Sequence, residues 1–349
     1  MIFWYNEPTG NLTTKKISSI EGEKNLMVSE KLLDFAMENY GFEKSTLNFI
    51  SDSTNQIYSF QKNGKPYILR FSERPIHQVK AEMDWLYYLA DNKVGVSLPL
   101  HTNNSELVIS TKDESKSFVV SAFESLPGKF WDKNNPDLWN DKLFFNWGKI
   151  MGDIHRLTKE YSPKNSNDVR SAFTGYDALD IDNIKKCPAV YKIAEGVISD
   201  VMNLPKDKDS YGLIHYDIHP WNFIINGEKI NVFDFDDSLY GWFSLDIGIA
   251  LYHGLWWGRK NDAGNDFTNE IIKNFLRGYL SANPINDFWI EKIPLFMKFR
   301  QICKFSWFYN SDNVDENQKE RLKNIENNIL FTNCNINQEL FKGIGILTK

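Results

Sequence analysis

The first third of the chain alternates short apolar runs with polar turns, a pattern typical of β-strands. Asn63-Gly64 separates two of these runs and is a strong signal for a hairpin turn. Pro75 opens a stretch of helical spacing, and an earlier one begins at Met27. The runs expected to form strands are residues 47–50, 57–61, 66–71, 106–110 and 117–123. We therefore predict a small lobe built on a mainly antiparallel sheet.

Helical spacing dominates after residues 126–128, a Leu-Pro-Gly sequence that we interpret as a linker. Residues 137–161 carry apolar side chains three and four positions apart, as in a long amphipathic helix. Further helices are expected at residues 247–257, 267–280, 288–309 and 316–331, and short strands at 212–215, 223–225 and 230–235. The predicted fold class is α+β, with a β-rich N-lobe at residues 27–125 and a larger, mostly helical C-lobe at residues 126–349.

Residues 1–26 show no clear periodicity and are expected to be an N-terminal extension foreign to the fold. One hypothesis is that Met27 is the natural start, because residues 21–23 can be encoded by a purine-rich, ribosome-binding sequence. The alternative is an N-terminal arm that packs on the surface.

Composition and charge narrow the function classes. The chain has 349 residues, of which 42% are hydrophobic and 25% charged, so it can bury a large core in two unequal lobes. A formal net charge of -6 and a pI near 5.6 argue against a nucleic-acid surface, which needs clustered Lys and Arg. We expect a small-molecule partner, cationic or neutral, and no nucleic acid.

The cysteines and the apolar runs indicate a compartment. Cys187, Cys303 and Cys334 are far apart and odd in number, which favours free thiols in a reducing cytosol. The longest apolar run, residues 247–257, contains His253 and is too short to span a bilayer. A cytoplasmic protein without a membrane segment is expected.

Three polar side chains fall at the ends of predicted strands. Asp217 and Asn222 lie in one loop with four residues between them, and Asp234 ends a hairpin that turns at residues 226–227. The hairpin folds back beside the loop, so Asp234 can reach the same point in space. Asn222 and Asp234 offer the hard oxygen ligands that Mg²⁺ prefers, which leaves Asp217 as a base.

Phosphoryl transfer needs this division of labour. Metal ligands neutralise the triphosphate, while one carboxylate accepts the proton of the acceptor hydroxyl and aligns it with the γ-phosphorus. The spacing Asp-x-x-x-x-Asn is that of a kinase catalytic loop, and the later Asp fills the second metal position. The residues therefore predict a kinase that uses ATP and Mg²⁺.

A family resemblance rests on the same segment. Residues 215–222 resemble the H-G-D-x-H-x-x-N sequence of the aminoglycoside phosphotransferase and choline/homoserine kinase superfamily, with Tyr216 in place of Gly. Residues 232–236 match the family's apolar-Asp-aromatic-acid pattern, and residues 148–155 resemble its Gly-to-His helix pattern. The resemblance covers roughly residues 45–280. It implies a protein-kinase-like, two-lobed fold and an ATP-dependent small-molecule kinase.

The resemblance also implies which residues contact the nucleotide. Arg70 takes the strand position of a phosphate-contacting Lys or Arg, and Glu82 is placed to pair with it from a helix. Residues 51–56 would cover the phosphates but contain no glycine, and residues 122–124 would present their backbone to adenine. The cofactor-binding residues expected are Arg70, Glu82, Ser53, Asn55, Ala122 and Glu124.

Four further residues are expected to support the site: His215, His219, Asp236 and Asp246. By the resemblance Asp246 supports the catalytic loop, and His215 braces it by bonding to backbone or to Asp246. His219 is structural in preference to lying near the transferred phosphate. Asp236 assists the metal or substrate site, because crowded acids need a cation nearby.

Two alternatives stay open. His215, Asp217 and His219 alternate and could bind zinc, which would make the protein a His/Asp metal-dependent hydrolase. Tyr216 and the glycine-free loop are also compatible with a catalytically inactive, nucleotide-binding regulatory protein. For a kinase, the family offers aminoglycosides, homoserine and choline-like amino alcohols as hydroxyl acceptors, and the acidic chain favours an amine-bearing one.

Overall fold

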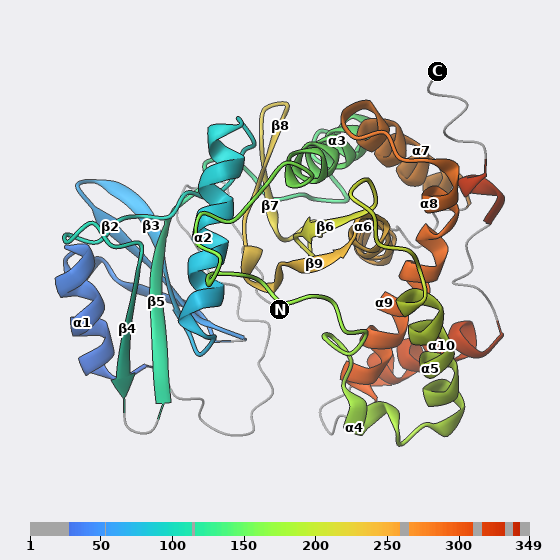
Figure 1. Cartoon of the computed structure of the whole chain (residues 1–349), viewed down its shortest axis with the longest axis horizontal. Helices are drawn as coiled ribbons and strands as arrows, with labels where there is room; N and C mark the ends of the chain where they lie inside the picture. Colours follow the sequence, from blue (N-terminus) through green and yellow to red (C-terminus); the bar gives the residue numbers. More distant parts are fainter. Residues whose placement is uncertain are drawn as a thin grey trace. The chain divides into compact units, whose positions relative to one another are not determined.

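The chain forms two compact units, each built from segments that are separated in sequence (Figure 1). The computed structural model describes residues 28–52, 54–113, 116–258, 265–309, 316–331 and 338–342. The first unit comprises residues 1–131, 161–170 and 221–236, and the second comprises residues 132–160, 171–220 and 237–349. The expected N-terminal extension, residues 1–26, lies outside the described residues, as does Met27.

The first unit is organised on a 5-stranded sheet in the order β1-β2-β3-β5-β4. All its neighbouring strands are antiparallel, as predicted. The strands are β1 (Asn48–Ser51), β2 (Gln56–Lys62), β3 (Lys65–Ser72), β4 (Val108–Asp113) and β5 (Lys116–Glu124). The β2–β3 hairpin turns at Asn63 and Gly64, both with positive φ, which is why this pair is favoured in such a turn.

Strand alternation in β3 sends neighbouring side chains to different surroundings. Leu69 and Phe71 belong to a hydrophobic core shared with α1 (Glu30–Tyr40). Between them, Arg70 bonds to a residue of α2 (Ile76–Asp91). The sheet thus holds one guanidinium in place while its neighbours fix the strand.

A short hairpin of β7 (Phe223–Asn226) and β8 (Lys229–Val232) completes the first unit. Isolated bridges tie it down, from Val96 to Val232 and from Lys129 to Ile225. The predicted strand at residues 230–235 ends early at Val232, because Asp234 has a left-handed φ of 65° that no strand can contain. The chain then enters a 3-10 turn, η2 (Phe235–Asp237).

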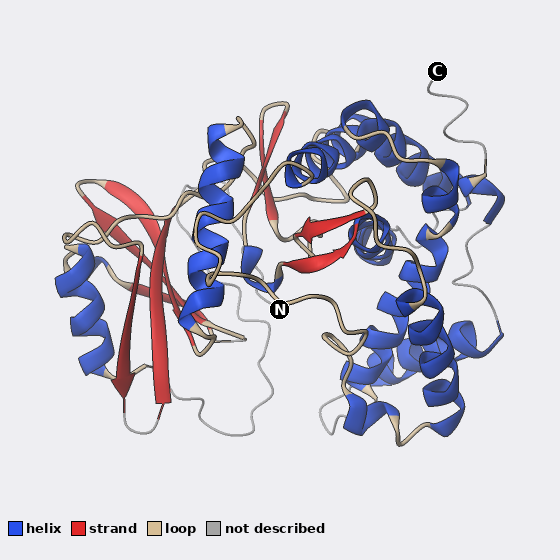
Figure 2. Cartoon of the chain, in the orientation of Figure 1, coloured by secondary structure: helices blue, strands red, loops and turns tan. Residues whose placement is uncertain are grey.

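The second unit is mostly helical (Figure 2). Its longest helices are α3 (Asp141–Thr158) and α7 (Asn265–Ala282), which pack closely. A Cβ at Gly148 would lie 1.9 Å from the carbonyl oxygen of Phe275, and one at Gly278 would lie 1.9 Å from that of Phe145. Glycine is required at both positions, since any side chain would push the two helices apart.

The remaining helices surround a core in which aromatic residues such as Trp242 and Phe296 are fully buried. They are α4 (Ile181–Ile184), α5 (Pro188–Met202), α6 (Phe243–Gly258), α8 (Asp287–Glu291), α9 (Ile293–Phe308) and α10 (Glu316–Phe331), with a 3-10 turn η3 (Gln338–Phe341). The single helix predicted at residues 288–309 is interrupted at Lys292: α8 ends at Glu291 and α9 begins at Ile293, with Pro294 in its first turn.

The second unit also has a two-stranded ladder, β6 (Tyr211–Ile214) with β9 (Leu239–Trp242). Strand β9 was not predicted, because its apolar side chains run into those of α6 and hide the boundary. The α+β class and the division into an antiparallel lobe and a helical portion are confirmed.

Two further expectations concern the whole chain. Cys187 and Cys303 are buried free thiols, and Cys334 lies outside the described residues. Within the part of the chain that the structure describes, no helix is long and apolar enough to cross a membrane.

Candidate active site

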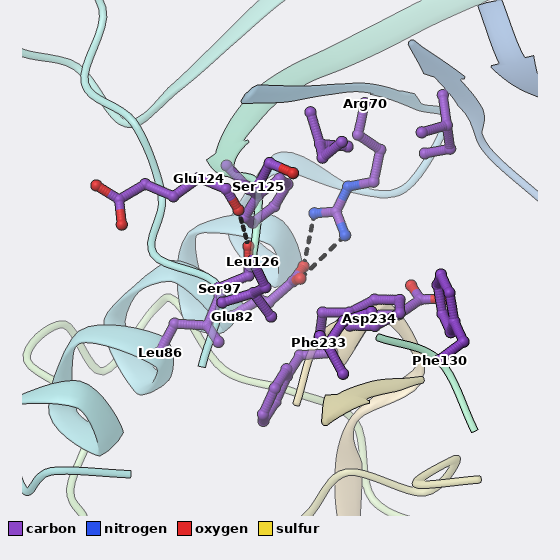
Figure 3. A pocket seen from close by; sticks show the side chains of 15 residues that line it. Arg70, Glu82, Leu86, Ser97, Glu124, Ser125, Leu126, Phe130, Phe233 and Asp234 are labelled. Carbon is purple, nitrogen blue, oxygen red and sulfur yellow. Dashed lines mark hydrogen bonds and ion pairs between the residues drawn. The ribbon is translucent and has the colours of Figure 1, made fainter. Parts of the chain in front are cut away.

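A pocket in the first unit has apolar walls and a charged end (Figure 3). Its empty space is about 880 Å³ when the open solvent at the mouth is included. The apolar side chains that line it come from several elements of the unit: Ile57, Ile68, Leu86, Phe123, Leu126, Phe130, Ile224, Phe233 and Phe235. The polar lining residues are Arg70, Glu82, Ser97, Glu124, Ser125 and Asp234. A flat apolar group with a charged extension would fit such a site.

The charged end is a buried, bidentate pair. Arg70 donates from Nη1 and Nη2 to the two carboxylate oxygens of Glu82, at 2.9 and 2.7 Å. The two side chains are only 4% and 1% exposed, and the guanidinium also lies 4.8 Å from the ring centre of Phe123. Nε of Arg70 has no hydrogen-bond partner among the described residues. The pair predicted from sequence is present, with donor capacity left over for an anion.

Asp236 gathers further cations around this pair. It lies 3.6 Å from Nη1 of Arg70 and accepts a hydrogen bond of 2.8 Å from Nε of Arg74. Nδ2 of Asn55 also donates to it, at 2.9 Å, which ties the glycine-free loop to this carboxylate. Burial alone would raise the pKa of Asp236, but the guanidinium groups of Arg70 and Arg74 outweigh burial and lower it.

Arg170 adds a third guanidinium that sequence patterns did not suggest. It is buried and donates to the backbone carbonyl groups of Gln78 and Asp236. Burial lowers its pKa, because the charged form loses its hydration. Arg74 and Arg170 thus join Arg70 near the carboxylates of Glu82, Asp236 and Asp234, and guanidinium groups suit phosphate oxygens.

The edge of the pocket that follows β5 has its backbone largely engaged. Glu124 donates its N–H to Leu98 at 2.8 Å, and its carbonyl accepts from the hydroxyl of Ser97 at 2.6 Å. Leu126 lines the pocket, and its backbone N–H and C=O have no partner in the described chain. Backbone groups of this kind are what a nucleobase edge needs.

One of the residues expected to contact the nucleotide, Ala122, is not part of the pocket lining. Ala122 is fully buried in β5, outside the pocket lining, and its carbonyl accepts the N–H of Leu100 at 2.8 Å. Ser53 lies outside the described residues. Of residues 122–124, which were expected to present their backbone to adenine, Glu124 lines the pocket, next to Ser125 and Leu126.

Asp234 and Asn222 are the candidate metal ligands of this unit. Asp234 lines the pocket and has a left-handed φ of 65°, a strained state for a residue other than Gly. Asn222 is buried at the start of β7, and its carbonyl accepts the N–H of Phe233 at 3.0 Å, which links the two ends of the hairpin. A carboxylate and an amide oxygen form a donor set that fits Mg²⁺.

Asp217 belongs to the second unit, because the chain passes from one unit to the other after Pro220. Its Oδ1 accepts a 2.6 Å hydrogen bond from Nη2 of Arg300, and its Oδ2 lies 3.3 Å from Nε2 of His219. Burial alone would raise the pKa of Asp217, but the His219 ring and the Arg300 guanidinium hold it well below its usual range. The carboxylate is ionised at any ordinary pH and held in one orientation.

Asp246 holds the loop that carries Asp217 in place through hydrogen bonds to the loop backbone. The carboxylate of Asp246 accepts the backbone N–H groups of His215 and Tyr216 at 3.1 and 2.9 Å, and contacts Nε2 of His155 at 3.1 Å. The His215 ring accepts the N–H of Asp217 at 3.3 Å. His215 and Asp246 lie where the sequence placed them as braces of this loop.

Tyr216 occupies a backbone position that favours Gly. Its φ is 73°, in the left-handed region where a side chain costs about 1–2 kcal/mol. The side chain is 4% exposed and packs near Phe173, and its hydroxyl has no hydrogen-bond partner in the described chain. The backbone turn is retained although the residue is not Gly.

Sequence patterns missed the cations on α9. Arg300 donates from Nε to Nε2 of His253 at 2.9 Å, and its guanidinium lies 4.9 Å from the ring centre of Trp307. Lys304 follows four positions later and is 3% exposed. The signal that could have found them is the four-residue spacing of Arg300 and Lys304 within a mostly apolar and aromatic run, residues 293–309.

Among the described residues, no group of three or more His, Cys, Asp and Glu side chains could hold a metal ion. The alternative of a zinc hydrolase at His215, Asp217 and His219 therefore has no support in this part of the chain. The side chains of Asp217 and His219 contact each other, and the His215 ring bonds to backbone.

Comparison with known proteins decides the family. Residues 46–288 match the phosphotransferase enzyme family. The chain belongs to this family. It is 32% identical over 327 residues to amicoumacin kinase of Bacillus subtilis (strain 168), covering 88% of this chain and 95% of that protein. The predicted resemblance to aminoglycoside phosphotransferase-like kinases is thereby confirmed.

Solved structures agree. An amicoumacin kinase in complex with AMP-PNP, Ca²⁺ and Ami has a TM-score of 0.82 and 26% identity, over 88% of this chain and 96% of that one. A microcompartment-associated aminopropanol kinase has a TM-score of 0.69 at 18% identity, over 91% and 99%, and shows the fold alone. The protein-kinase-like fold is confirmed. As a member of this family the protein is an ATP-dependent small-molecule kinase, and such kinases use a divalent metal ion.

Proposed function

We propose that the protein transfers the γ-phosphoryl group of ATP to a hydroxyl group of a small-molecule antibiotic, with amicoumacin as the first candidate acceptor. The observation that carries the transfer is the pocket of the first unit, where apolar walls end at the buried Arg70–Glu82 pair and at Asp234. The observation that carries the acceptor is the 32% identity to an amicoumacin kinase over most of both chains.

In this proposal the pocket holds the nucleotide. The apolar side chains of Ile68, Phe233 and their neighbours take the adenine ring, and the backbone of Leu126 is available to its polar edge. Arg70 donates to the phosphate oxygens while Glu82 keeps its guanidinium in place. A planar fork suits both tasks, because it can bond to a carboxylate on one side and to a phosphate on the other.

Asn222 and Asp234 would hold Mg²⁺, which neutralises charge on the phosphates as the bond to the leaving group breaks. The strained backbone of Asp234 supports this role, because strain outside glycine persists where a side chain must point in one direction. Asp236 does not bind the metal ion in our proposal, because its carboxylate oxygens face Asn55, Arg70 and Arg74.

Asp217 would orient the acceptor hydroxyl by accepting its hydrogen bond. With its pKa held far below the usual range, Asp217 is a weak base, so it positions the hydroxyl first and takes the proton late. A loose transition state for phosphoryl transfer tolerates this order, because the attacking oxygen needs little activation before bond formation. The positioning of Asp217 by Arg300 and Asp246 then contributes more to the transfer rate than the basicity of Asp217 does.

The test is ADP release from ATP and Mg²⁺ with single acceptors. The panel contains amicoumacin, an aminoglycoside, homoserine, choline and aminopropanol, and transfer is verified by the mass of the product. We expect phosphorylated amicoumacin and little turnover with the others. If another compound of the panel is phosphorylated and amicoumacin is not, that compound replaces amicoumacin as the proposed acceptor. If nucleotide binds and no compound accelerates ADP release, the protein is instead the inactive nucleotide-binding regulator.

A further inference from the structure

Lys304 is a buried ammonium group that the proposed transfer does not use. It lies on α9 four positions after Arg300, so both side chains share one face of the helix. Its residue is 3% exposed, and its Nζ lies 5.4 Å from the ring centre of Trp307, 5.6 Å from that of Trp257 and 5.1 Å from that of Phe308. Aromatic rings thus surround the charge.

Charge partners do not explain its burial. Among the described residues, no carboxylate lies within ion-pair distance of the Lys304 ammonium, and no group forms a hydrogen bond to this side chain. Asp217 attracts it from further away, and this carboxylate is already bonded to Arg300. Contacts with aromatic rings contribute about 0.5–2 kcal/mol each, whereas burying an unpaired ion costs several kcal/mol. Burial and Arg300 accordingly lower the pKa of Lys304 to about 7.

The same cluster includes the residue that orients the acceptor. Arg300 bonds to Asp217, and its guanidinium lies 4.9 Å from the ring centre of Trp307, the ring that Lys304 also contacts. The side chain of Asp217 is 19% exposed, and Trp257 and Trp307 are half-buried. A molecule that reaches Asp217 therefore approaches two half-buried indole rings, behind which the buried cations Arg300 and Lys304 lie.

We propose that Lys304, Trp257 and Trp307 form an acceptor subsite next to Asp217, which binds a carboxylate or carbonyl oxygen that the acceptor carries close to its reacting hydroxyl. This proposal rests on the proposed kinase function and names the chemistry of its acceptor. The ammonium donates to that oxygen, and the two indole rings cover the adjoining apolar atoms. An amine elsewhere on the acceptor is unaffected.

Electrostatics decide between an oxygen and an ammonium at this subsite. A hydrogen bond from a charged donor is worth about 1.5–3 kcal/mol. Arg300 is already paired with Asp217, so an acceptor ammonium would instead face the unpaired charge of Lys304, and a like charge at 4 Å costs about 4 kcal/mol at an intermediate dielectric. Beside the reacting hydroxyl, the general preference for an amine-bearing acceptor is therefore reversed.

The experiment compares three matched alcohols as acceptors of phosphate from ATP and Mg²⁺: 3-hydroxypropanoate, 3-hydroxypropanamide and 3-aminopropan-1-ol. In the wild-type protein, kcat/KM is expected to be at least 10-fold higher for the first two than for the amino alcohol, which corresponds to about 1.4 kcal/mol. Lys304→Met should reduce this ratio at least 10-fold and leave KM for ATP unchanged.

Two further variants separate the possible outcomes. Lys304→Arg keeps the charge and should keep most of the preference, whereas Lys298→Met, on the same helix, should behave as wild type. A wild-type preference for the amino alcohol, or an unchanged ratio in Lys304→Met, overturns the subsite while phosphate transfer stands. If no alcohol, amicoumacin included, receives phosphate, the kinase function fails and the subsite with it. Should Lys304→Met not fold, the wild-type ratio and Lys304→Arg still decide.

Discussion

Replacing Arg300 with Gln removes the guanidinium that fixes Asp217. The wild-type bond is short, at 2.6 Å from Nη2 to Oδ1, and the two side chains are 5% and 19% exposed. A hydrogen bond between charged groups is worth about 1.5–3 kcal/mol, and the partial exposure of Asp217 favours the lower half of this range. If orientation of the acceptor depends on this bond, kcat should fall about 10- to 100-fold.

The loss of activity in Arg300→Gln should affect the kinetics of the acceptor and not those of ATP. KM for ATP should stay unchanged, because Arg300 belongs to the second unit and the nucleotide pocket is lined by residues of the first. Steady-state kinetics with each substrate varied in turn separate the two effects. Arg277→Gln is a suitable control, since Arg277 is exposed and its Nη1 bonds to Asn274 on the same helix.

A pH profile makes the test sharper. In the wild type, Asp217 has a depressed pKa, so it stays ionised and its contribution is lost only at strongly acidic pH. In Arg300→Gln the pKa of Asp217 moves back towards its usual range, so activity should begin to fall at a higher pH. Arg300→Lys should restore part of the rate, because one ammonium cannot bond to Asp217 and His253 together as the guanidinium does. Wild-type kcat and an unshifted acid limb in Arg300→Gln would refute the reasoning.

Other perturbations test separate parts of the structure. Glu82→Met leaves Arg70 buried without its bidentate partner and should cost about 3–5 kcal/mol of stability in urea unfolding. Adding Arg70→Met should recover most of this stability and abolish nucleotide binding. Equal stability of the single and double variants would contradict the importance of the Arg70–Glu82 pair. Tyr216→Phe removes a buried, unpaired hydroxyl and should leave the free energy of unfolding unchanged or raise it, and a loss above 1 kcal/mol would show a missed partner. The pKa of Lys304 is lowered to about 7 in the folded protein, so between pH 7 and 10 the unfolded chain binds one proton more than the folded one, and wild-type stability should rise with pH over this range. In Lys304→Met this rise should shrink. An identical pH dependence in the variant and the wild type would contradict the lowered pKa.

Sequence patterns predicted the parts of the fold that local chemistry determines. The hairpin at Asn63-Gly64 was found because its turn needs two residues that tolerate positive φ. Strand β9 was missed, because its pairing with β6 is a long-range contact and its residues continue into the apolar start of α6. Local patterns do not record which distant strand completes a ladder.

The candidate site divides in the same way. Asp217, Asn222 and Asp234 were found from their order and spacing, and Arg70 and Glu82 from the family resemblance. Arg300 was not, because it lies 83 positions from Asp217 and is brought to it only by the packing of α9. Asp236 was expected to assist the metal or substrate site, and this stays a prediction; its neighbours in the structure include Asn55, Arg70 and Arg74.

The most direct test of the central claim is phosphate transfer by Asp217→Asn, measured beside nucleotide binding. The amide keeps the size of the side chain but loses the charge that orients the acceptor hydroxyl. With ATP, Mg²⁺ and amicoumacin, we predict that the wild type forms phosphorylated product and that Asp217→Asn binds ATP normally while its transfer rate falls by at least 100-fold. Transfer by the variant at the wild-type rate would contradict the account.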